Sequence, residues 1–261
     1  MTPRTASRAG PVLMASAAAL FVAYAAWQVV EGARFGSIVP IDFDLYRAAT
    51  SRWLAGGPFY EPWQLAGPYD VRHGAILYPP VALYLFVPFT VLPAALWWAL
   101  PLSVTAWAIW RLRPGPAAWP LLALCVAWPP TLALVVHGNP GLYAMAAVAL
   151  AALYRWPAAL VLVKPSLAPF ALIGARDRRW WAALAVLAVL ALPFAAMWAD
   201  WARAVADARG AGLLYSAQEV PMIVIGVIAW AARTDRGNDD GERSGRDGRG
   251  VTAPSVDDLR D

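Results

Sequence analysis

Cysteine and lysine are almost absent from this sequence, and charged residues of either sign are scarce. The one cysteine, Cys125, lies in an apolar stretch, which excludes a disulfide or a cysteine-ligated metal site within the chain. Charged residues make up 15% of the 261 residues, whereas 60% are hydrophobic and fifteen are tryptophan. This composition is typical of a polytopic membrane protein that is surrounded by membrane lipids.

Positive charge exceeds negative charge by a formal +4, so a nucleic-acid partner has to be considered. The basic residues flank apolar runs, as the positive-inside rule expects of a membrane protein, and do not cluster on one face. We therefore expect no nucleic acid among the partners of this protein.

The first apolar run covers residues 11–30 and follows Arg4 and Arg8. About twenty residues without a charge are enough to cross roughly 30 Å of hydrocarbon, so we expect a signal anchor. Cleavage as a signal peptide is the alternative, because Ala23-Tyr24-Ala25 has the small-x-small form. The apolar core is, however, longer than the roughly seven to fifteen residues of such peptides.

A polar segment, residues 31–75, separates this run from the next one. Within it, residues 42–54 have apolar side chains at helical spacing and are followed by Gly56-Gly57-Pro58. This pattern predicts a short amphipathic helix, which would lie along the membrane surface. We expect the whole segment to form a large first outer loop.

Further apolar runs predict additional spans after this loop. Their approximate bounds are residues 77–92, 94–112, 117–136, 141–154, 157–175, 180–198 and 221–232. The runs at 141–154 and 221–232 are shorter than an ordinary span, so re-entrant segments are an alternative there. The expected fold is an all-α integral membrane protein with seven or eight transmembrane helices, counting the anchor.

The distribution of arginines predicts the orientation of these spans. With the N-terminus and Arg176–Arg179 in the cytoplasm, an eight-span path places the 31–75 loop outside and the chain end inside. Arg111 and Arg113 then lie outside, against the rule. Residues 233–261 are polar, which predicts a disordered cytoplasmic tail after a membrane domain of residues 1–232.

Lys164, the one lysine of the chain, lies within an apolar run of residues 156–173. An ammonium group is costly to bury in a membrane, so this lysine is a candidate functional residue that requires an anionic partner. Snorkelling to the outer interface is the alternative. Eight apolar-run residues precede Lys164, however, which disfavours that alternative.

Asp42 and Asp44 lie where the polar loop returns to the membrane. A carboxylate in that place is a candidate general base, because partial burial moves its pKa toward the working range. The alternative is structural, since aspartate directly before a helix is a preferred N-cap.

Several motifs occur in an ordered series. They are Asp42–Ala49 (Asp-Phe-x-x-Tyr-x-Ala-Ala), Gly56–Tyr60 (Gly-x-Pro-x-Tyr), Tyr78-Pro79-Pro80, His137-Gly138-Asn139 and Val163-Lys164-Pro165. In order and spacing, the series resembles the glycosyltransferase 87 family of polyprenyl-phosphate-mannose-dependent mannosyltransferases. The chain departs from that family in having fewer spans, Asn139 where glutamine is usual, and a polar segment, Ser216–Glu219, where an outer loop is expected.

The resemblance implies a class C glycosyltransferase fold in a bacterial plasma membrane, with the active site facing outside. It implies transfer of mannose from a polyprenyl-phosphate donor to a hydroxyl of a lipid or glycan acceptor in the cell envelope. The family's essential aspartate matches Asp42, with Asp44 as second choice, and makes residues 31–75 the catalytic loop.

One carboxylate acting as general base is sufficient for transfer with inversion of the sugar. Cationic groups would then stabilise the leaving phosphate. The candidates for binding substrate and phosphate are Lys164, Arg47, Arg72, His73, His137, Asn139 and Tyr78. The structural alternatives are that Arg47 holds the helix against lipid headgroups, that Arg72 and His73 are solvated, and that His137 ends a helix.

Asp42-Phe43-Asp44 precedes a surface helix and no soluble nucleotide-binding half follows it, so we expect neither a nucleotide sugar, a metal nor another cofactor. Two other functions stay open at this stage. One is a small transporter in which Lys164 and a loop carboxylate line a substrate path. The other is a shortened, non-catalytic subunit of a membrane enzyme complex.

Overall fold

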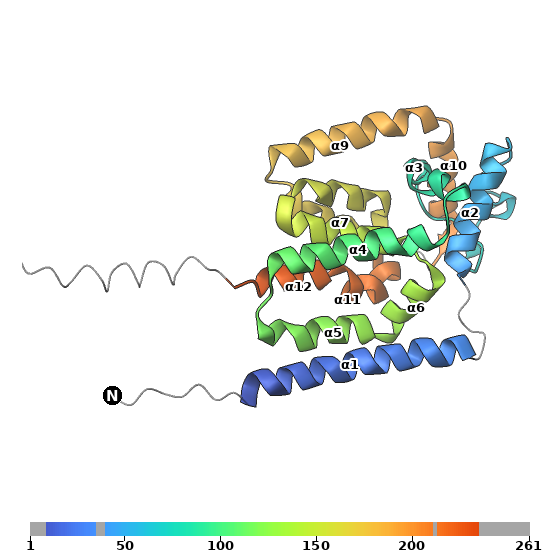
Figure 1. Ribbon diagram of the computed structural model, residues 1–261. Coiled ribbons are helices and arrows are strands. Elements are labelled where there is room, and N and C mark those ends of the chain that lie inside the picture. The colour runs from blue at the N-terminus through green and yellow to red at the C-terminus, as the bar shows by residue number, and fades with distance from the viewer. Residues whose placement is uncertain (1–8, 35–39, 211–212, 235–261) are drawn as a thin grey trace, which may run out of the picture.

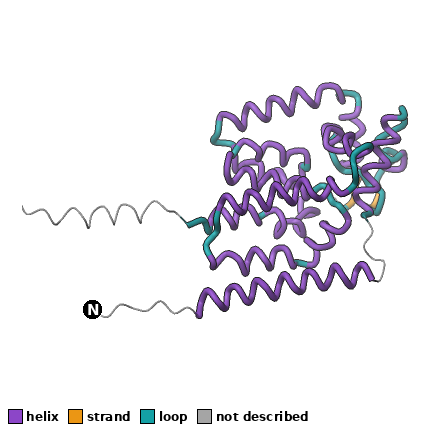
Figure 2. Tube along the Cα trace, viewed as in Figure 1, coloured by secondary structure: helices purple, strands orange, loops and turns teal. Residues whose placement is uncertain are grey.

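The computed structural model describes residues 9–34, 40–210 and 213–234, and these are predominantly helical (Figure 2). The described α-helices are α1 (Ala9–Arg34), α2 (Ile41–Leu54), α3 (Leu83–Phe86), α4 (Ala95–Leu112), α5 (Trp119–Ala127), α6 (Pro129–His137), α7 (Gly141–Tyr154), α8 (Ala168–Ala171), α9 (Arg178–Ala191), α10 (Met197–Asp207), α11 (Val220–Ile223) and α12 (Ile225–Ala231). The predicted tail lies outside the described residues from residue 235 onward.

Short 3₁₀-helices join many of these elements. They are η1 (Pro62–Gln64), η2 (Pro80–Ala82), η3 (Val87–Thr90), η4 (Pro116–Ala118), η5 (Trp156–Val163), η6 (Pro165–Leu167), η7 (Leu172–Gly174), η8 (Leu192–Phe194) and η9 (Leu213–Glu219). The two strands, β1 (Tyr69–Asp70) and β2 (Ala208–Arg209), pair in parallel and tie the segment 40–75 to the end of α10.

Helices α1, α4, α5 and α9 run approximately parallel to one another (Figure 1). Helices α2, α3 and α10 gather at one end of this bundle, which we call the α2 end. The predicted amphipathic helix at residues 42–54 corresponds to α2, and the predicted anchor lies within α1.

The predicted span at residues 77–92 is not a single helix. This segment consists of η2, α3 and η3, and its axis is bent by 117° relative to α4. Pro79, Pro80 and Pro88 prevent a continuous helix, because proline removes a backbone donor and clashes with the preceding turn. The segment packs instead beside α2, where Phe86 stacks on Tyr46 with ring centroids 4.8 Å apart.

The predicted span at residues 157–175 is also not a single helix. The 3₁₀-helix η5 ends at Val163, Lys164 has non-helical dihedral angles (φ −119°, ψ 86°), and the chain then returns through η6, α8 and η7. The Arg155 guanidinium donates to the Ile173 carbonyl, and a Cβ on Gly174 would strike the Arg155 carbonyl oxygen. Residues 156–174 therefore form a helical hairpin with Lys164 at its turn.

Two further predicted spans are broken where the sequence has proline. Helices α5 and α6 meet at Trp128 with a bend of 59°, and the segment from α9 through η8 bends by 99° into α10. Among the described residues, no single helix has both the length and the apolarity to cross a membrane; three bent pairs, including these two, reach that length together.

If residues 77–92 are not counted as a span, the predicted orientation no longer places Arg113 on the outer side, which the positive-inside rule disfavours. The end of α4 lies at the same end of the bundle as the starts of α1 and α9 (Figure 1). Because residues 77–92 do not run the length of the bundle, Arg113 and Arg178 fall on the same side. The positive-inside rule then accommodates both in one orientation, which remains a prediction.

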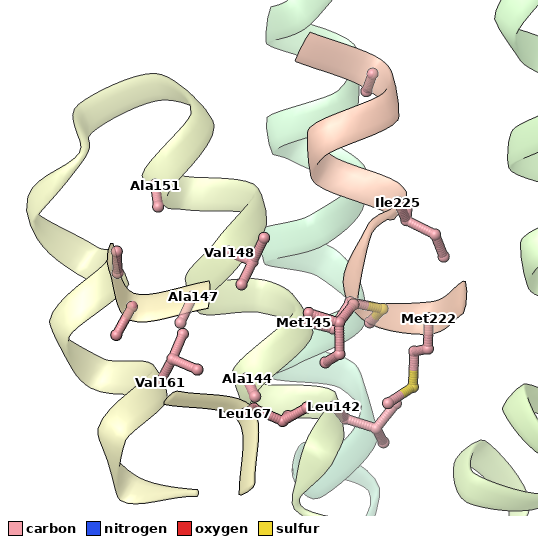
Figure 3. Close-up of a cluster of buried hydrophobic side chains, with 14 of the residues drawn as sticks. Leu142, Ala144, Met145, Ala147, Val148, Ala151, Val161, Leu167, Met222 and Ile225 are labelled. Carbon is pink, nitrogen blue, oxygen red and sulfur yellow. The ribbon is translucent and has the colours of Figure 1, made fainter. Parts of the chain in front are cut away.

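The central core lies around α7. Side chains of α7, including Leu142, Met145 and Val148, meet Val161 of η5 and Met222 of α11 (Figure 3). Much of α7 is alanine, and small side chains let neighbouring helices approach closely. The tight packing of α7 fixes the hairpin and α11 to one another, and both contribute to the site described below.

Gly226 in α12 provides a test of this packing. A Cβ at this position would lie 2.5 Å from the Ala149 Cα, so the Gly226→Ala variant must separate α12 from α7. We expect it to lower the free energy of unfolding by about 1–3 kcal/mol. Denaturation of purified protein in detergent measures this loss.

Gly115→Ala is the matched control, because a Cβ there makes ordinary contact with the Ala232 carbonyl oxygen at 3.4 Å. We expect a change below about 0.5 kcal/mol for this variant. Equal stabilities of the two variants would show that the α7–α12 contact does not depend on glycine.

Candidate functional site

Four polar side chains from four distant segments form one connected chain at the α2 end. Asp42 Oδ2 accepts a hydrogen bond from Asn139 Nδ2 at 2.7 Å, and Asn139 Oδ1 accepts one from Lys164 Nζ at 3.1 Å. The Lys164 ammonium also lies 2.7 Å from each carboxylate oxygen of Glu219. The Asp42 carboxylate of α2 is thus linked to the lysine of the hairpin through a single amide.

Helix α2 directs Asp42 toward this chain. Phe43, Tyr46 and Ala49 form its buried face, while Asp44 is exposed. The helix begins at Ile41 after Pro40, and no side chain caps its start. The N-cap role considered for these aspartates is therefore contradicted, and the Asp42 side chain is used for a tertiary contact with Asn139.

The turn after α6 presents Asn139. Gly138 adopts a left-handed conformation (φ 69°) that favours glycine, and a Cβ there would lie 2.8 Å from Trp98 and 2.9 Å from Phe43. The Gly138 carbonyl accepts a hydrogen bond from the Trp97 indole at 2.8 Å. This glycine therefore lets the turn approach α2 closely enough for Asn139 to reach Asp42.

The contacts of Asn139 fix the orientation of its amide. Its oxygen accepts from the Gly141 backbone N–H at 2.8 Å as well as from the Lys164 ammonium, both of which are donors. Its nitrogen must therefore face Asp42, and a carboxylate is the acceptor it needs. The uncharged amide thus fixes the position of the lysine relative to the aspartate. It does not neutralise the charge of either side chain.

Lys164 is held at the turn of the hairpin. Its backbone N–H donates to the Val161 carbonyl at 2.9 Å, and Pro165 begins the return. The residue is 8% exposed, and its ammonium lies 5.4 Å from the centre of the Tyr78 ring. Residues at a turn inside the protein can direct a side chain toward a polar site, which a lysine on a continuous lipid-facing helix could not do.

Glu219 is the anionic partner that the sequence required for Lys164 but did not identify. It ends η9, is 2% exposed and precedes α11. A Cβ on Gly141 would lie 2.6 Å from Glu219 Oε2, so glycine at the start of α7 makes room for the carboxylate. The polar segment Ser216–Glu219 was a signal in the sequence, but nothing local relates it to a lysine 55 residues earlier.

The connected chain borders a cavity of about 250 Å³, which we call the polar cavity. Asn139, Lys164 and Glu219 line it together with Tyr46 and Tyr78, whereas Asp42 reaches it through Asn139. Trp201 and Val205 of α10 form another part of the wall, and the Trp201 indole donates to the Leu77 carbonyl at 3.1 Å. The sequence does not predict α10 as a separate helix, because the predicted span at residues 180–198 already includes its first two residues.

The segment between α2 and η2 supports Tyr78 through buried polar contacts. The Tyr60 hydroxyl donates to the Tyr78 carbonyl at 2.9 Å, and burial raises the pKa of Tyr60 above its usual value, so this hydroxyl keeps its proton. Gln64, fully buried, exchanges hydrogen bonds with the backbone N–H and carbonyl of Ile76. These contacts hold the segment that places Tyr78 between the loop and Lys164.

Other predicted site residues lie away from the polar cavity. Asp44, Arg47, Arg72 and His73 are exposed, and the Arg72 guanidinium lies 4.3 Å from the Trp63 ring centre. His137 is half-buried at the end of α6 and is not part of the cavity wall. Their roles in binding remain predictions, whereas Asp42, Asn139, Lys164 and Tyr78 are brought together. Within the described residues, no group of three or more histidine, cysteine, aspartate or glutamate side chains could hold a metal ion.

Comparison with protein families gives one match. Residues 76–243, more than half of the chain, match the model of glycosyltransferase family 87. The matched region includes Tyr78, Asn139, Lys164 and Glu219, while Asp42 precedes it. Searches of curated proteins and of solved structures found no match.

Proposed function

Because this chain belongs to glycosyltransferase family 87, whose proteins are membrane glycosyltransferases, we propose that it transfers mannose from a polyprenyl-phosphate donor. The acceptor is a hydroxyl of a lipid or glycan of the cell envelope, and the site faces the outside of the plasma membrane. The observation that carries this proposal is the connected chain of Asp42, Asn139, Lys164 and Glu219 beside a cavity.

Asp42 is the general base of the proposed reaction. Its carboxylate takes the proton of the acceptor hydroxyl while the hydroxyl oxygen attacks the anomeric carbon of the sugar. The bond from that carbon to the donor phosphate oxygen breaks, and the lipid phosphate leaves with the bonding electrons. Attack from the face opposite the leaving group inverts the anomeric centre.

A retaining mechanism would need a second carboxylate as nucleophile, near the base and able to attack the sugar. Asp44 is exposed on α2, and both oxygens of Glu219 contact the Lys164 ammonium. Neither carboxylate is placed as a free nucleophile beside Asp42, which supports inversion.

Lys164 stabilises the charge that develops on the leaving phosphate. It is a cation held at the wall of a largely buried site, where a fixed charge acts more strongly than in water. Glu219 neutralises it in the structure, so a phosphate must share the ammonium with Glu219 or take its place. Glu219 thus keeps a buried lysine stable until an anionic substrate binds.

Reconstitution of the purified protein in liposomes with radiolabelled polyprenyl-phosphate mannose tests the proposal. We expect labelled mannose to appear on members of a panel of lipid and glycan acceptors, and Lys164→Met to reduce this transfer at least tenfold. Arg111→Met is the control, because Arg111 is exposed in the last turn of α4 and does not line the polar cavity. Protein-dependent movement of the labelled donor from one leaflet of the liposome to the other, without transfer, would indicate a transporter. Transfer that requires an added membrane protein would indicate a subunit.

A further inference from the structure

A groove of about 370 Å³ runs between α9 and η5, and we call it the α9 groove. Trp156 and Leu160 of η5 form one wall. The other wall consists of residues at helical spacing on α9, namely Arg179, Ala182, Ala183, Val186, Leu187 and Leu190. None of these residues lines the polar cavity, so the α9 groove is separate from the candidate site.

Helix α9 is packed less completely than the centre of the bundle. All 14 of its residues are described, and Trp180 is the one among them that is buried. Helix α7, which also has 14 residues, buries nine of them. Most α9 side chains after Trp181 are nevertheless apolar. The groove therefore leaves apolar surface of α9 and η5 open to a ligand that is itself apolar.

Positive charge lies at one end of the groove. Arg179 is the one charged residue in the groove wall. Its backbone N–H donates to Asp177 Oδ1 at 2.8 Å, whereas its guanidinium makes no ion pair or hydrogen bond with another described residue. Arg176 and Arg178 are also exposed there, against the single acid Asp177. An anion with oxygen acceptors is the complement of such a guanidinium.

Exposed tryptophans mark the depth of this charged end in the membrane. Trp156 at the start of η5 is 39% exposed, and Trp181 in the first turn of α9 is 58% exposed. Such tryptophans gather at the boundary between membrane and water. Helix α9 begins at the end of the bundle opposite the α2 end (Figure 1). Arg179 therefore lies at the level of the lipid headgroups, far from the candidate site.

The length of the groove limits its occupant to one leaflet. Leu190 lies eleven residues after Arg179, and at 1.5 Å per residue the wall on α9 is about 16 Å long. The hydrocarbon core of a bilayer is roughly 30 Å thick, so this length is about half of it. One acyl chain of a phospholipid fits that distance, with its phosphate at the charged end. Free phosphate would leave the apolar wall uncovered.

We propose that the α9 groove binds one anionic two-chain phospholipid, with its phosphate at Arg179 and one acyl chain between α9 and η5. The lipid comes from the leaflet at that end of the bundle, which is the cytoplasmic leaflet in the predicted orientation. Its second chain stays in the bilayer. The bound chain packs against η5, which ends directly before Lys164, and so supports the limb that carries this lysine.

Charge determines which lipid is preferred. An acyl chain that leaves the bilayer for an apolar groove exchanges one hydrocarbon environment for another, so the hydrophobic effect contributes little to binding. The phosphate of a zwitterionic lipid is accompanied by a cationic group, which the arginines at residues 176–179 repel. A lipid with a net negative charge lacks that repulsion. We therefore expect phosphatidylglycerol to bind more tightly than phosphatidylcholine.

Native mass spectrometry of the purified chain, titrated with phosphatidylglycerol, measures the dissociation constant of the first lipid. Arg179→Gln removes the cation, and Val186→Trp fills the groove from a position that is 57% exposed. We expect roughly tenfold weaker binding for each variant, because a hydrogen bond to a charged group or the space for the chain is lost.

Two matched controls leave the groove intact. Arg111→Gln removes an exposed arginine of α4 at the same end of the bundle, and Val189→Trp adds a ring at a position of α9 that is 63% exposed. Neither residue lines the groove, so we expect unchanged binding for both. Equal losses for Val186→Trp and Val189→Trp, or for Arg179→Gln and Arg111→Gln, would overturn the assignment.

A photoreactive phosphatidylglycerol with its reactive group in an acyl chain provides a second measurement on the unaltered protein. We expect cross-links on α9 and η5 that excess phosphatidylglycerol suppresses and that equal amounts of phosphatidylcholine or undecaprenyl phosphate do not. Equal competition by phosphatidylcholine would indicate an unselective layer of lipid and reject the proposal. Stronger competition by undecaprenyl phosphate, or cross-links confined to other helices, would reject it as well. Neither measurement involves sugar transfer, so its outcome is independent of the proposed function.

Discussion

Replacing Asp42 with asparagine is expected to reduce the rate of sugar transfer by about 10²- to 10⁴-fold, the usual contribution of a general base. Asparagine has the same shape as aspartate, and its side-chain oxygen still accepts the hydrogen bond that Asn139 Nδ2 donates to Asp42 at 2.7 Å. The variant therefore removes the capacity to take a proton and keeps the contact. Initial rates at saturating donor and acceptor measure the effect.

Asp44→Asn is the matched control for this variant. Both aspartates lie in the first turn of α2, but Asp44 is exposed and Asp42 contacts Asn139. We expect Asp44→Asn to change the rate less than threefold. If Asp44→Asn abolished transfer while Asp42→Asn did not, the assignment of the base would be wrong.

A measurement of donor binding distinguishes the loss of the general base from a loss of the folded site. Asp42→Asn should bind undecaprenyl phosphate as the unaltered protein does, because Asp42 does not line the polar cavity directly. A variant that loses transfer and lipid binding together would indicate that Asp42 organises the site and does not react. The rate of transfer and the binding constant are thus both required.

Separating the Lys164–Glu219 pair is expected to cause the largest loss of stability. Glu219→Leu leaves an ammonium group that is 8% exposed without its carboxylate, and such a loss costs about 3–5 kcal/mol. Lys164→Met leaves the Glu219 carboxylate uncompensated and should cost a similar amount. The free energy of unfolding in detergent measures both variants.

The double variant Lys164→Met/Glu219→Leu tests whether the loss of stability comes from an unpaired buried charge or from the loss of each side chain separately. Replacing a buried ion pair by apolar groups of similar volume is often neutral or stabilising by about 1–4 kcal/mol. Asn139 Oδ1 still accepts the Gly141 backbone N–H in the double variant. We therefore expect stability close to that of the unaltered protein, together with loss of transfer.

Additive losses would contradict this interpretation. A double variant as unstable as the sum of the single variants would mean that the two residues act independently. Recovered stability with unchanged transfer would show that the pair has a structural role and that Lys164 does not contact the donor. The second result would also reject the proposed function of the lysine.

Elements with local signals were predictable from the sequence. The predicted helix at residues 42–54 corresponds to α2 at Ile41–Leu54, because its apolar spacing and the following Gly56-Gly57-Pro58 are local features. The runs at 94–112 and 141–154 likewise correspond to α4 and α7. Their length and apolarity determine them without long-range information.

The hairpin at residues 156–174 could not be recognised from apolar length. A run of this length satisfies the criterion for a span whether it crosses the bundle or turns back. Lys164-Pro165 in its middle was the available signal, because proline interrupts a helix and a buried cation needs a partner. Hydropathy contains no information about the direction in which the chain continues.

The candidate site was predicted in part. The resemblance to a family predicts that Asp42, Asn139 and Lys164 share one site. In the structure, Asn139 forms hydrogen bonds with both Asp42 and Lys164. Glu219 and the wall formed by α10 depend on packing between distant segments, which no local pattern reports. Arg72 and His73 were selected for their chemistry alone, and the structure leaves both exposed.

A protein with twenty arginines and one lysine has a single ε-amino group, and here that group is enclosed with Glu219. Guanidinium groups do not react with ordinary acylating reagents, so the α-amino terminus and Lys164 are the amines such reagents can modify. The rate of acylation at Lys164 therefore reports how often the ion pair opens. One mass-spectrometric peptide can follow that opening in intact membranes, with no label introduced into the chain.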